Sequence, residues 1–210
     1  IVKEINTYKP HFINNVPSLY LLLMNTPGFK DMDFSTVRYA TAAAAPFPVE
    51  PMRELETIIG GEKVVELYGL TETSPLVTLN PVLGKKKIGS VGLPAPSTDV
   101  RLVDLETGER QVPQGEKGEL IVCGPQVMKG YWNNPEETAI ALREHDGRQW
   151  LHSGDIAIMD EEGYFTIVDR SKDMIIVGGF KVFPREVEEK LYQHPAVEVC
   201  AVVGIPNPDR

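Results

Sequence analysis

The sequence predicts an α/β fold joined to a β-rich part and to the start of a small α+β domain. Short strands alternate with helical segments up to about residue 87, as in sheets with helical cover. Short apolar runs then alternate with Gly and Pro turns, and from residue 171 a strand and a turn precede a helix. We therefore divide the chain into an α/β subdomain, a small distorted β-barrel-like subdomain and an incomplete α+β domain, spanning residues 1–87, 88–170 and 171–210.

Composition indicates an ordinary soluble globular protein and excludes several classes. The 210 residues are 42% hydrophobic and 24% charged, and a chain of this length buries roughly 70% of its unfolded surface. The net charge of -9 argues against a nucleic-acid partner, because such binding needs clustered Lys and Arg. The basic run Lys85-Lys86-Lys87 is interpreted as a solvated loop without a role.

Cysteine spacing and hydropathy point to a cytoplasmic protein. Cys123 and Cys200 lie far apart in apolar segments without metal-ligand spacing, so we expect buried, reduced thiols. No apolar run approaches the ~20 residues that span a bilayer, and the N-terminus lacks a signal-peptide pattern. The sequence begins at Ile1 without Met and ends at Arg210 after a Pro-Asn-Pro turn, so we expect it to be part of a longer protein.

The first third of the chain predicts strands and helices in alternation. Pro17 suits the first turn of a helix that runs to about Met24, and a second helix is expected over Val49–Ile59. The expected strands are Pro10–Asn14, Val37–Ala40 and Val64–Tyr68. Strands and helices in this order imply a parallel or mixed sheet.

The β-rich part contains a hairpin that brings two distant residues together. Its predicted strands are Ile156–Met159 and Tyr164–Val168, with Gly163 left-handed in the turn between them. Asp155 precedes the first strand and Arg170 follows the second. Because a hairpin brings its open ends together, this carboxylate and guanidinium should be neighbours.

The last forty residues or so predict a unit too small for a core of its own. We expect a strand over Met174–Val177, a turn at Gly178-Gly179 and a helix beginning at Pro184. Ala196–Ile205 is expected to form a further strand.

The segment Leu67–Pro75 carries the side chains of a nucleotide site on the loop that follows a strand. Tyr68 could stack on a purine, and the Thr71 hydroxyl could donate to a phosphate oxygen. Glu72 is a hard oxygen ligand of the kind that Mg²⁺ accepts beside phosphates. Gly69 would let the backbone turn through angles that a β-carbon resists. The alternative interpretation is a plain polar turn.

Five motifs in order give the chain a resemblance to a known family. They are Tyr68-Gly69-Leu70-Thr71-Glu72-Thr73, Gly89-Ser90-Val91-Gly92-Leu93-Pro94, Gly130-Tyr131-Trp132-Asn133-Asn134-Pro135-Glu136-Glu137-Thr138, His152-Ser153-Gly154-Asp155 and Asp169-Arg170-Ser171-Lys172-Asp173. With them the chain resembles the adenylate-forming superfamily of acyl-CoA synthetases and AMP-binding enzymes, and especially its long-chain fatty-acid CoA ligases. The resemblance extends over essentially the whole chain.

The resemblance implies a reaction and its cofactors. In this family a carboxylate attacks the α-phosphate of ATP to give an acyl-adenylate and pyrophosphate, and CoA then displaces AMP. Fatty acid, ATP, Mg²⁺ and CoA are the implied substrates and cofactors. The resemblance assigns Tyr68 and Gly69 to the adenosine, Thr71 to the α-phosphate and Glu72 to Mg²⁺, with Thr71 and Glu72 as the catalytic residues.

Further implied roles fall on the ribose, the acyl pocket and the mobile domain. Asp155 would accept both ribose hydroxyls, supported by Arg170. The alternative for Asp155 is a carboxylate that caps a turn, and the alternative for Arg170 is a surface ion pair.

Ala43, Ala44 and Ala45 match a Gly-richer segment that lines the adenine and acyl pocket, or else form a packing point. Lys172 matches the hinge of the mobile C-terminal domain, and Gly178 and Gly179 match a loop at the CoA tunnel; an exposed lysine and a plain turn are the alternatives. His152 is interpreted as a packing or hydrogen-bonding residue.

The sequence departs from the family pattern at both ends. We find no upstream phosphate loop ending in Lys and no late catalytic Lys, so we expect a central fragment that is inactive alone. Its parent would be cytoplasmic, with peripheral membrane association open, and the fragment could dimerise through newly exposed apolar surface. The alternatives are a non-catalytic nucleotide-binding or assembly module, an aryl-CoA ligase and a peptide-synthetase adenylation domain.

Overall fold

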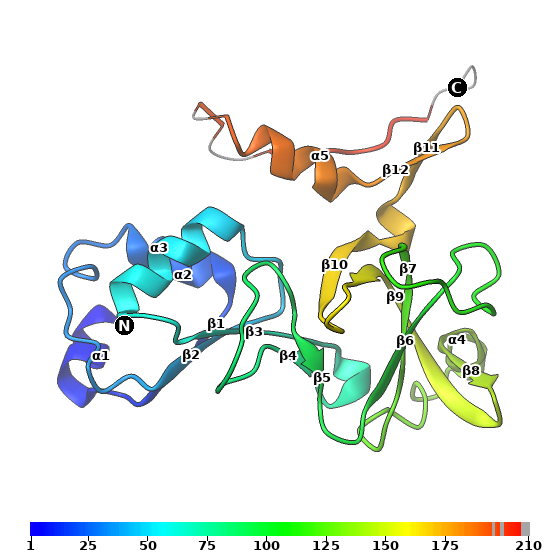
Figure 1. Ribbon diagram of the computed structural model, residues 1–210, viewed down its shortest axis with the longest axis horizontal. Coiled ribbons are helices and arrows are strands. Elements are labelled where there is room, and N and C mark those ends of the chain that lie inside the picture. The colour runs from blue at the N-terminus through cyan, green and yellow to red at the C-terminus, as the bar shows by residue number, and fades with distance from the viewer. Residues whose placement is uncertain (195, 198–199, 207–210) are drawn as a thin grey trace. The chain divides into compact units, whose positions relative to one another are not determined.

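A computed structural model describes residues 1–194, 196–197 and 200–206 (Figure 1). They form two compact units, one of residues 1–98 with 125–128, the other of residues 99–124 with the described residues beyond 128. The predicted subdomain boundaries at residues 87 and 170 stay predictions. The predicted combination of α/β and β-rich parts is confirmed by the sheets described below.

The first unit is built on a mixed sheet of five strands. In chain order they are β1 (Phe12–Asn15), β2 (Tyr39–Ala42), β3 (Val64–Gly69), β4 (Leu76–Leu79) and β5 (Leu93–Pro94), which is also their order in the sheet. β1 to β3 are parallel, and β4 and β5 are antiparallel to their neighbours. The predicted strand at Val37–Ala40 begins two residues later, because the Val37 amide closes a turn onto Phe34.

Two helices of this unit match the predictions and one does not. α2 (Pro17–Met24) and α3 (Val49–Ile59) pack together over the parallel strands, with Tyr20, Leu55 and Ile59 in the core (Figure 1). α1 (Val2–Tyr8) was not predicted, because it buries only Ile5 and therefore shows no apolar periodicity.

The second unit is an antiparallel sheet with the order β10-β9-β7-β6, and β8 pairs with β9. Its strands are β6 (Asp99–Val103), β7 (Gly118–Cys123), β8 (Leu142–His145), β9 (Arg148–Met159) and β10 (Phe165–Arg170), and α4 (Pro135–Ala141) precedes β8. Trp150, Ile121 and Val103 form one of its cores. The predicted β-rich character and the β9–β10 hairpin are confirmed, with Gly163 at φ 83 in the turn.

The C-terminal segment packs on this sheet. η2 (Ser171–Asp173) leads to a hairpin of β11 (Ile175–Val177) and β12 (Phe180–Val182), and then to α5 (Pro184–Leu191). The predicted strand, glycine turn and helix are confirmed, whereas β12 was not predicted. Phe183 packs against Ile156 and Val168. Glu186 forms an ion pair with Lys117 at 2.6 Å.

The predicted strand at Ala196–Ile205 is wrong over the residues that the structure describes there, 196–197 and 200–205. The backbone amide of Val202 donates to Glu188 Oε1 at 2.8 Å, so a side chain of α5 satisfies it in place of a neighbouring strand. Residues 195 and 198–199 lie outside the described part.

Both cysteines are free thiols, as predicted. Cys123 is buried in β7, whereas Cys200 is half-buried, which corrects the expectation of two buried thiols. Over the described residues, the helices are too short or too polar for any of them to cross a membrane.

Candidate functional site

The loop after β3 is held by one buried threonine. Thr73 is fully buried in η1 (Thr71–Thr73), and its Oγ1 lies 2.8 Å from Pro75 O and accepts the Leu70 amide at 3.1 Å. The Leu70 amide also donates to Pro75 O at 2.9 Å. This closed loop leaves Thr71 exposed and Glu72 half-buried, which suits side chains that meet a ligand.

Gly69 is required by space rather than by its backbone angles. It is absent from the residues with positive φ, which corrects the expected reason for a glycine here. A β-carbon at this position would lie 1.6 Å from Pro75 O. The close return of the chain to β4 therefore excludes any side chain.

A distant segment supports the same loop. The Met128 amide donates to Glu72 O at 2.7 Å. Gln126 donates to Leu76 O at 3.0 Å and to Thr98 Oγ1 at 2.8 Å. These contacts could not be predicted from the sequence, since 50 residues separate Gln126 from Leu76 and 28 separate it from Thr98.

The Gly89–Gly92 motif is fixed to β3 and β4. Glu66 Oε2 accepts the Gly89 amide at 2.9 Å, and Asn80 donates to Ser90 O at 2.6 Å. A β-carbon on Gly92 would lie 2.0 Å from Leu79 O. Glu66 was missed in the sequence, although a carboxylate within the apolar run Val64–Leu67 was a usable signal.

The alanine segment follows the end of β2. Ala43 is half-buried, Ala44 and Ala45 are exposed, and Ala44 has φ 68. That left-handed conformation is typical of glycine, in agreement with the Gly-richer segment that the resemblance implies. The part of these alanines in a ligand pocket stays a prediction.

Asp155 and Arg170 are neighbours, as the hairpin predicted. They stand opposite each other in the β9–β10 register, with Arg170 Nε 3.2 Å from Asp155 Oδ1. Both lie inside their strands rather than beyond the strand ends, because the strands are longer than expected. The Asp155 side chain is 6% exposed and that of Arg170 is 56% exposed, so Arg170 covers a buried carboxylate.

The residues expected in the mobile domain lie on exposed turns. Lys172 is exposed in η2. Gly178 and Gly179 form the two-residue turn of the β11–β12 hairpin with φ 57 and φ 84, which this type of hairpin requires. A plain turn accounts for both glycines, and their place at a CoA tunnel stays a prediction, as does the hinge at Lys172.

The motif at residues 130–138 serves to start α4. Asn134 accepts the Glu137 amide at 3.2 Å as the N-cap, with Pro135 at the first helical position. Thr138 Oγ1 accepts the Tyr131 amide at 2.9 Å. This motif therefore has a structural explanation within its own segment.

His152 is buried and hydrogen-bonded, as predicted. Its Nδ1 lies 3.0 Å from Glu119 Oε2, and its Nε2 lies 2.9 Å from His145 Nε2. Burial raises the pKa of Glu119, but the hydrogen bond and charge of His152, with smaller effects of the Gly154 amide and Arg143, hold that pKa below its ordinary value. Glu119 and His145 were not predicted as functional residues.

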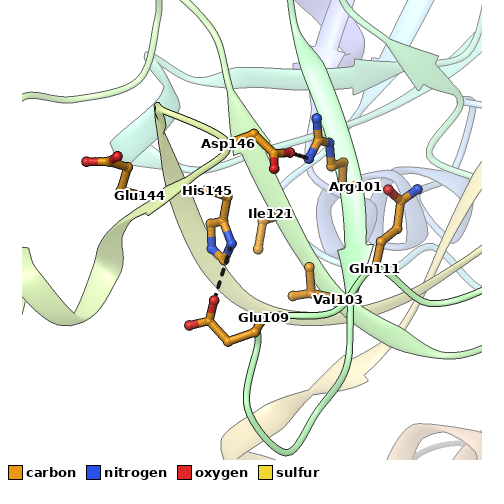
Figure 2. Close-up of a pocket in the computed structure, with 8 residues that line it drawn as sticks. All are labelled: Arg101, Val103, Glu109, Gln111, Ile121, Glu144, His145 and Asp146. Atoms are coloured by element: carbon orange, nitrogen blue, oxygen red, sulfur yellow. Dashed lines mark hydrogen bonds and ion pairs between the residues drawn. The ribbon is translucent and has the colours of Figure 1, made fainter.

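His145 also lines a pocket of about 230 Å³ in the second unit (Figure 2). Figure 2 shows its ring facing Glu109, with Nδ1 3.8 Å from Glu109 Oε2, and Asp146 paired with Arg101 at 2.6 Å. The lining residues are Arg101, Val103, Glu109, Gln111, Ile121, Glu144, His145 and Asp146. The predicted nucleotide residues do not line this pocket.

Comparison with known proteins decides the family. The sequence model of the AMP-binding enzyme family matches residues 1–132, more than half of the chain. The chain belongs to this family of adenylate-forming enzymes. It is 48% identical over 206 residues to a long-chain-fatty-acid–CoA ligase of Bacillus subtilis (strain 168), covering 98% of this chain and 36% of that protein.

A further relative and a solved structure are also similar to the chain. A feruloyl-CoA synthase of Amycolatopsis sp is 44% identical over 210 residues, covering 99% of this chain and 41% of that protein. The crystal structure of ATP-bound MatB from Rhodopseudomonas palustris superposes with a TM-score of 0.90 at 35% identity, covering 100% of this chain and 41% of that chain. The chain thus spans well under half the length of the relatives it matches.

The predicted nucleotide residues fall into two clusters. Tyr68, Thr71 and Glu72 lie in the first compact unit, and Asp155 and Arg170 lie in the second. Each cluster is well ordered by its own contacts, and their convergence on one ligand stays a prediction.

Proposed function

We propose that the protein containing this chain is an ATP-dependent fatty acyl-CoA ligase and that these residues carry its adenosine and magnesium contacts. The observation that carries the proposal is the buried Asp155 carboxylate, which is paired with Arg170 at 3.2 Å. The 48% identity to a long-chain-fatty-acid–CoA ligase supports the acyl substrate.

In the first unit, Tyr68 would stack on the adenine and Thr71 would donate its hydroxyl to the α-phosphate. The exposure of Thr71 on a loop closed by Thr73 supports this role, because the hydroxyl needs no rearrangement to meet a ligand. Because Gly69 has no side chain, Pro75 can approach it closely and the chain can form that loop. Ala43, Ala44 and Ala45 would line the adenine and acyl pocket, where small side chains leave room.

Glu72 would hold Mg²⁺. Its carboxylate is a hard oxygen ligand on an accessible loop, and no group of three His, Cys, Asp or Glu side chains suited to a metal occurs among the described residues. This donor set fits Mg²⁺, which is commonly bound by one or two carboxylates with phosphate oxygens and water as the other ligands. When bound, the ion would neutralise charge on the phosphates.

In the second unit, Asp155 would accept both hydroxyls of the ribose. Two carboxylate oxygens match a vicinal diol, and the buried position of Asp155 strengthens such hydrogen bonds. Arg170 would keep the carboxylate oriented. Lys172 would act as the hinge of the C-terminal domain, and Gly178 and Gly179 would allow CoA to pass closely.

The chemistry depends on charge control and positioning. The substrate carboxylate attacks the α-phosphorus and pyrophosphate leaves; the CoA thiol then attacks the acyl carbon and AMP leaves. Groups that hold the phosphates and the ribose accelerate both steps by fixing the reacting atoms. We propose that the protein acts in the cytoplasm, with fatty acid, ATP and CoA as its partners.

Pyrophosphate exchange tests the proposal. With a long-chain fatty acid, the full-length protein should exchange radiolabelled pyrophosphate into ATP, and the isolated 210-residue chain should not. Failure of exchange by the full-length protein with every carboxylic acid tried would refute the ligase assignment. Exchange by the isolated chain would refute its predicted inactivity.

An aryl-CoA ligase is the second candidate, since 99% of this chain aligns with a feruloyl-CoA synthase at 44% identity. Comparing kcat/KM for palmitate with that for a hydroxycinnamate separates the two. A non-catalytic nucleotide-binding module would instead bind ATP without exchange of pyrophosphate.

A further inference from the structure

Glu119 lies where the pairing of β7 with β9 is interrupted. Glu119 pairs with Ile156 and Ile121 pairs with His152, so the single residue Leu120 faces three residues of β9, 153–155. Gly154 within this bulge has φ 71. The interrupted ladder leaves backbone groups of Gly154 and Asp155 to be satisfied in another way.

Side chains replace the missing ladder bonds. Glu119 Oε1 accepts the Gly154 amide at 3.0 Å. Ser153 Oγ donates to Leu120 O at 2.6 Å and accepts the Asp155 amide at 3.1 Å. The peptide that leads into Asp155 is thus fixed by Glu119 and Ser153, and bulges commonly redirect a side chain in this way.

The second oxygen of the Glu119 carboxylate is held by a pair of histidines. This oxygen, Oε2, lies 3.0 Å from Nδ1 of His152, whose Nε2 lies 2.9 Å from Nε2 of His145. The ionised carboxylate can only accept, so Nδ1 of His152 carries the proton of this bond, and Nε2 of His152 shares a hydrogen bond with His145. The side chains of His152 and Glu119 are 3% and 17% exposed. These hydrogen bonds hold the Glu119 carboxylate in one orientation.

We propose that Glu119 is a positioning residue for the nucleotide site: it fixes the Gly154 peptide so that the Asp155 carboxylate is presented to the ribose. The inference rests on the proposed function, from which it takes the ribose contact of Asp155. It adds to that site a residue that precedes Gly154 by 35 positions. His152 and His145 act through Glu119 by holding its orientation.

The test measures ATP affinity of the full-length protein by titration calorimetry. Glu119→Ala should weaken ATP binding about fivefold, less than the tenfold or more expected for Asp155→Ala. Glu119→Gln should restore most of the affinity, because its amide oxygen can still accept from Gly154 while its NH₂ group donates to the other tautomer of His152. Glu109→Gln is the matched control and should bind as the wild type does, since Glu109 lies 3.8 Å from His145 and both histidines separate it from Glu119.

A thermodynamic cycle separates positioning from general destabilisation. Glu119→Ala should have no further effect in an Asp155→Ala background, and none on 2′,3′-dideoxy-ATP, which lacks the ribose diol. Ser153→Ala, which frees the Asp155 amide, should reproduce the pattern if Glu119→Ala does not fold.

Two results would overturn the inference. If Asp155→Ala weakens ATP binding but the Glu119 effect adds to it fully, or is equal for both nucleotides, the inference fails and the proposed function stands. If Asp155→Ala leaves ATP affinity unchanged, the ribose contact of the proposed function fails together with the inference.

Discussion

At the scale of single residues, each of the two predicted clusters is held by a neighbouring side chain of the motifs themselves. Thr73 closes the loop that presents Thr71, and Arg170 covers the carboxylate of Asp155. Buried polar groups with satisfied hydrogen bonds rigidify a site, because breaking them exposes unpaired groups. Substitutions that remove these supporting contacts should therefore weaken nucleotide binding more than substitutions on the open surface do.

Asp155→Ala in the full-length protein should weaken ATP binding by about 1.5–3 kcal/mol, the range for a hydrogen bond to a charged group. The Arg170 side chain, which is 56% exposed, can turn to water, so the fold should survive the change. Titration calorimetry with ATP measures the effect. An affinity equal to that of the wild type would contradict the ribose contact.

The lowered pKa of Glu119 makes a prediction about acid stability. Because this pKa lies below the ordinary value of 4.5 in the fold, the ionised carboxylate stabilises the protein above pH 4.5, and this contribution is lost as the pH falls through the folded pKa. Glu119→Gln should therefore lose less unfolding free energy than the wild type on acidification below pH 4.5. Denaturant titrations across this range measure it, with Glu109→Gln following the wild type. Parallel curves for the wild type and Glu119→Gln would contradict the prediction.

At the scale of elements, the predictions succeeded where contacts are local. The helix Val49–Ile59 follows from its own apolar periodicity, and the vicinity of Asp155 and Arg170 follows from a short hairpin turn. Contacts across long sequence separations could not be predicted. The Glu119 bonds to His152 and Gly154 span 33 and 35 residues, and a single sequence does not show which strand lies beside which.

The predicted strand at Ala196–Ile205 failed for a related reason. An apolar run forms a strand only where a partner offers a ladder, and here α5 supplies a side-chain acceptor through Glu188 for the described Val202 amide. α1 was not predicted, because a helix that buries one residue has no periodic pattern of apolar residues. The nucleotide loop was recognisable because its chemistry is contained in a few consecutive residues.

The Tyr20 hydroxyl links α2 to the parallel strands, and its contribution to the free energy of unfolding should be measurable. This buried hydroxyl lies 3.1 Å from Ile13 O on β1 and 3.0 Å from Thr41 O on β2, and burial raises its pKa above the ordinary value. Tyr20→Phe should destabilise the protein by about 1 kcal/mol, because the Ile13 and Thr41 carbonyls lose the hydroxyl donor that they share.

Chemical denaturation measures the change in the free energy of unfolding. Tyr8→Phe is the control, since the Tyr8 side chain is 75% exposed and its change should stay within about 0.5 kcal/mol. Equal effects of the two substitutions would contradict the role of Tyr20.

At the scale of the whole molecule, the first unit exposes apolar side chains near a sheet edge. β1 lies at the end of the five-stranded sheet as described, and Phe12 and Val16 are 46% and 41% exposed. Unpaired strand edges and apolar patches promote association. We therefore predict that the isolated chain forms dimers or larger species as its concentration rises.

Light scattering over a range of concentrations measures this association. Phe12→Lys should reduce it, and Leu83→Lys should not, because Leu83 is 91% exposed but lies on a loop away from β1. A wild-type chain that stays monomeric at the highest concentration would contradict the prediction.

The central claim is that the Tyr68–Thr71–Glu72 loop and the Asp155–Arg170 pair serve one nucleotide. A crystal structure of the full-length protein with AMP tests it most directly. The account predicts the Tyr68 ring against the adenine and the Asp155 oxygens within about 3 Å of both ribose hydroxyls. An AMP molecule bound to one cluster, with the functional groups of the other facing elsewhere, would contradict the account.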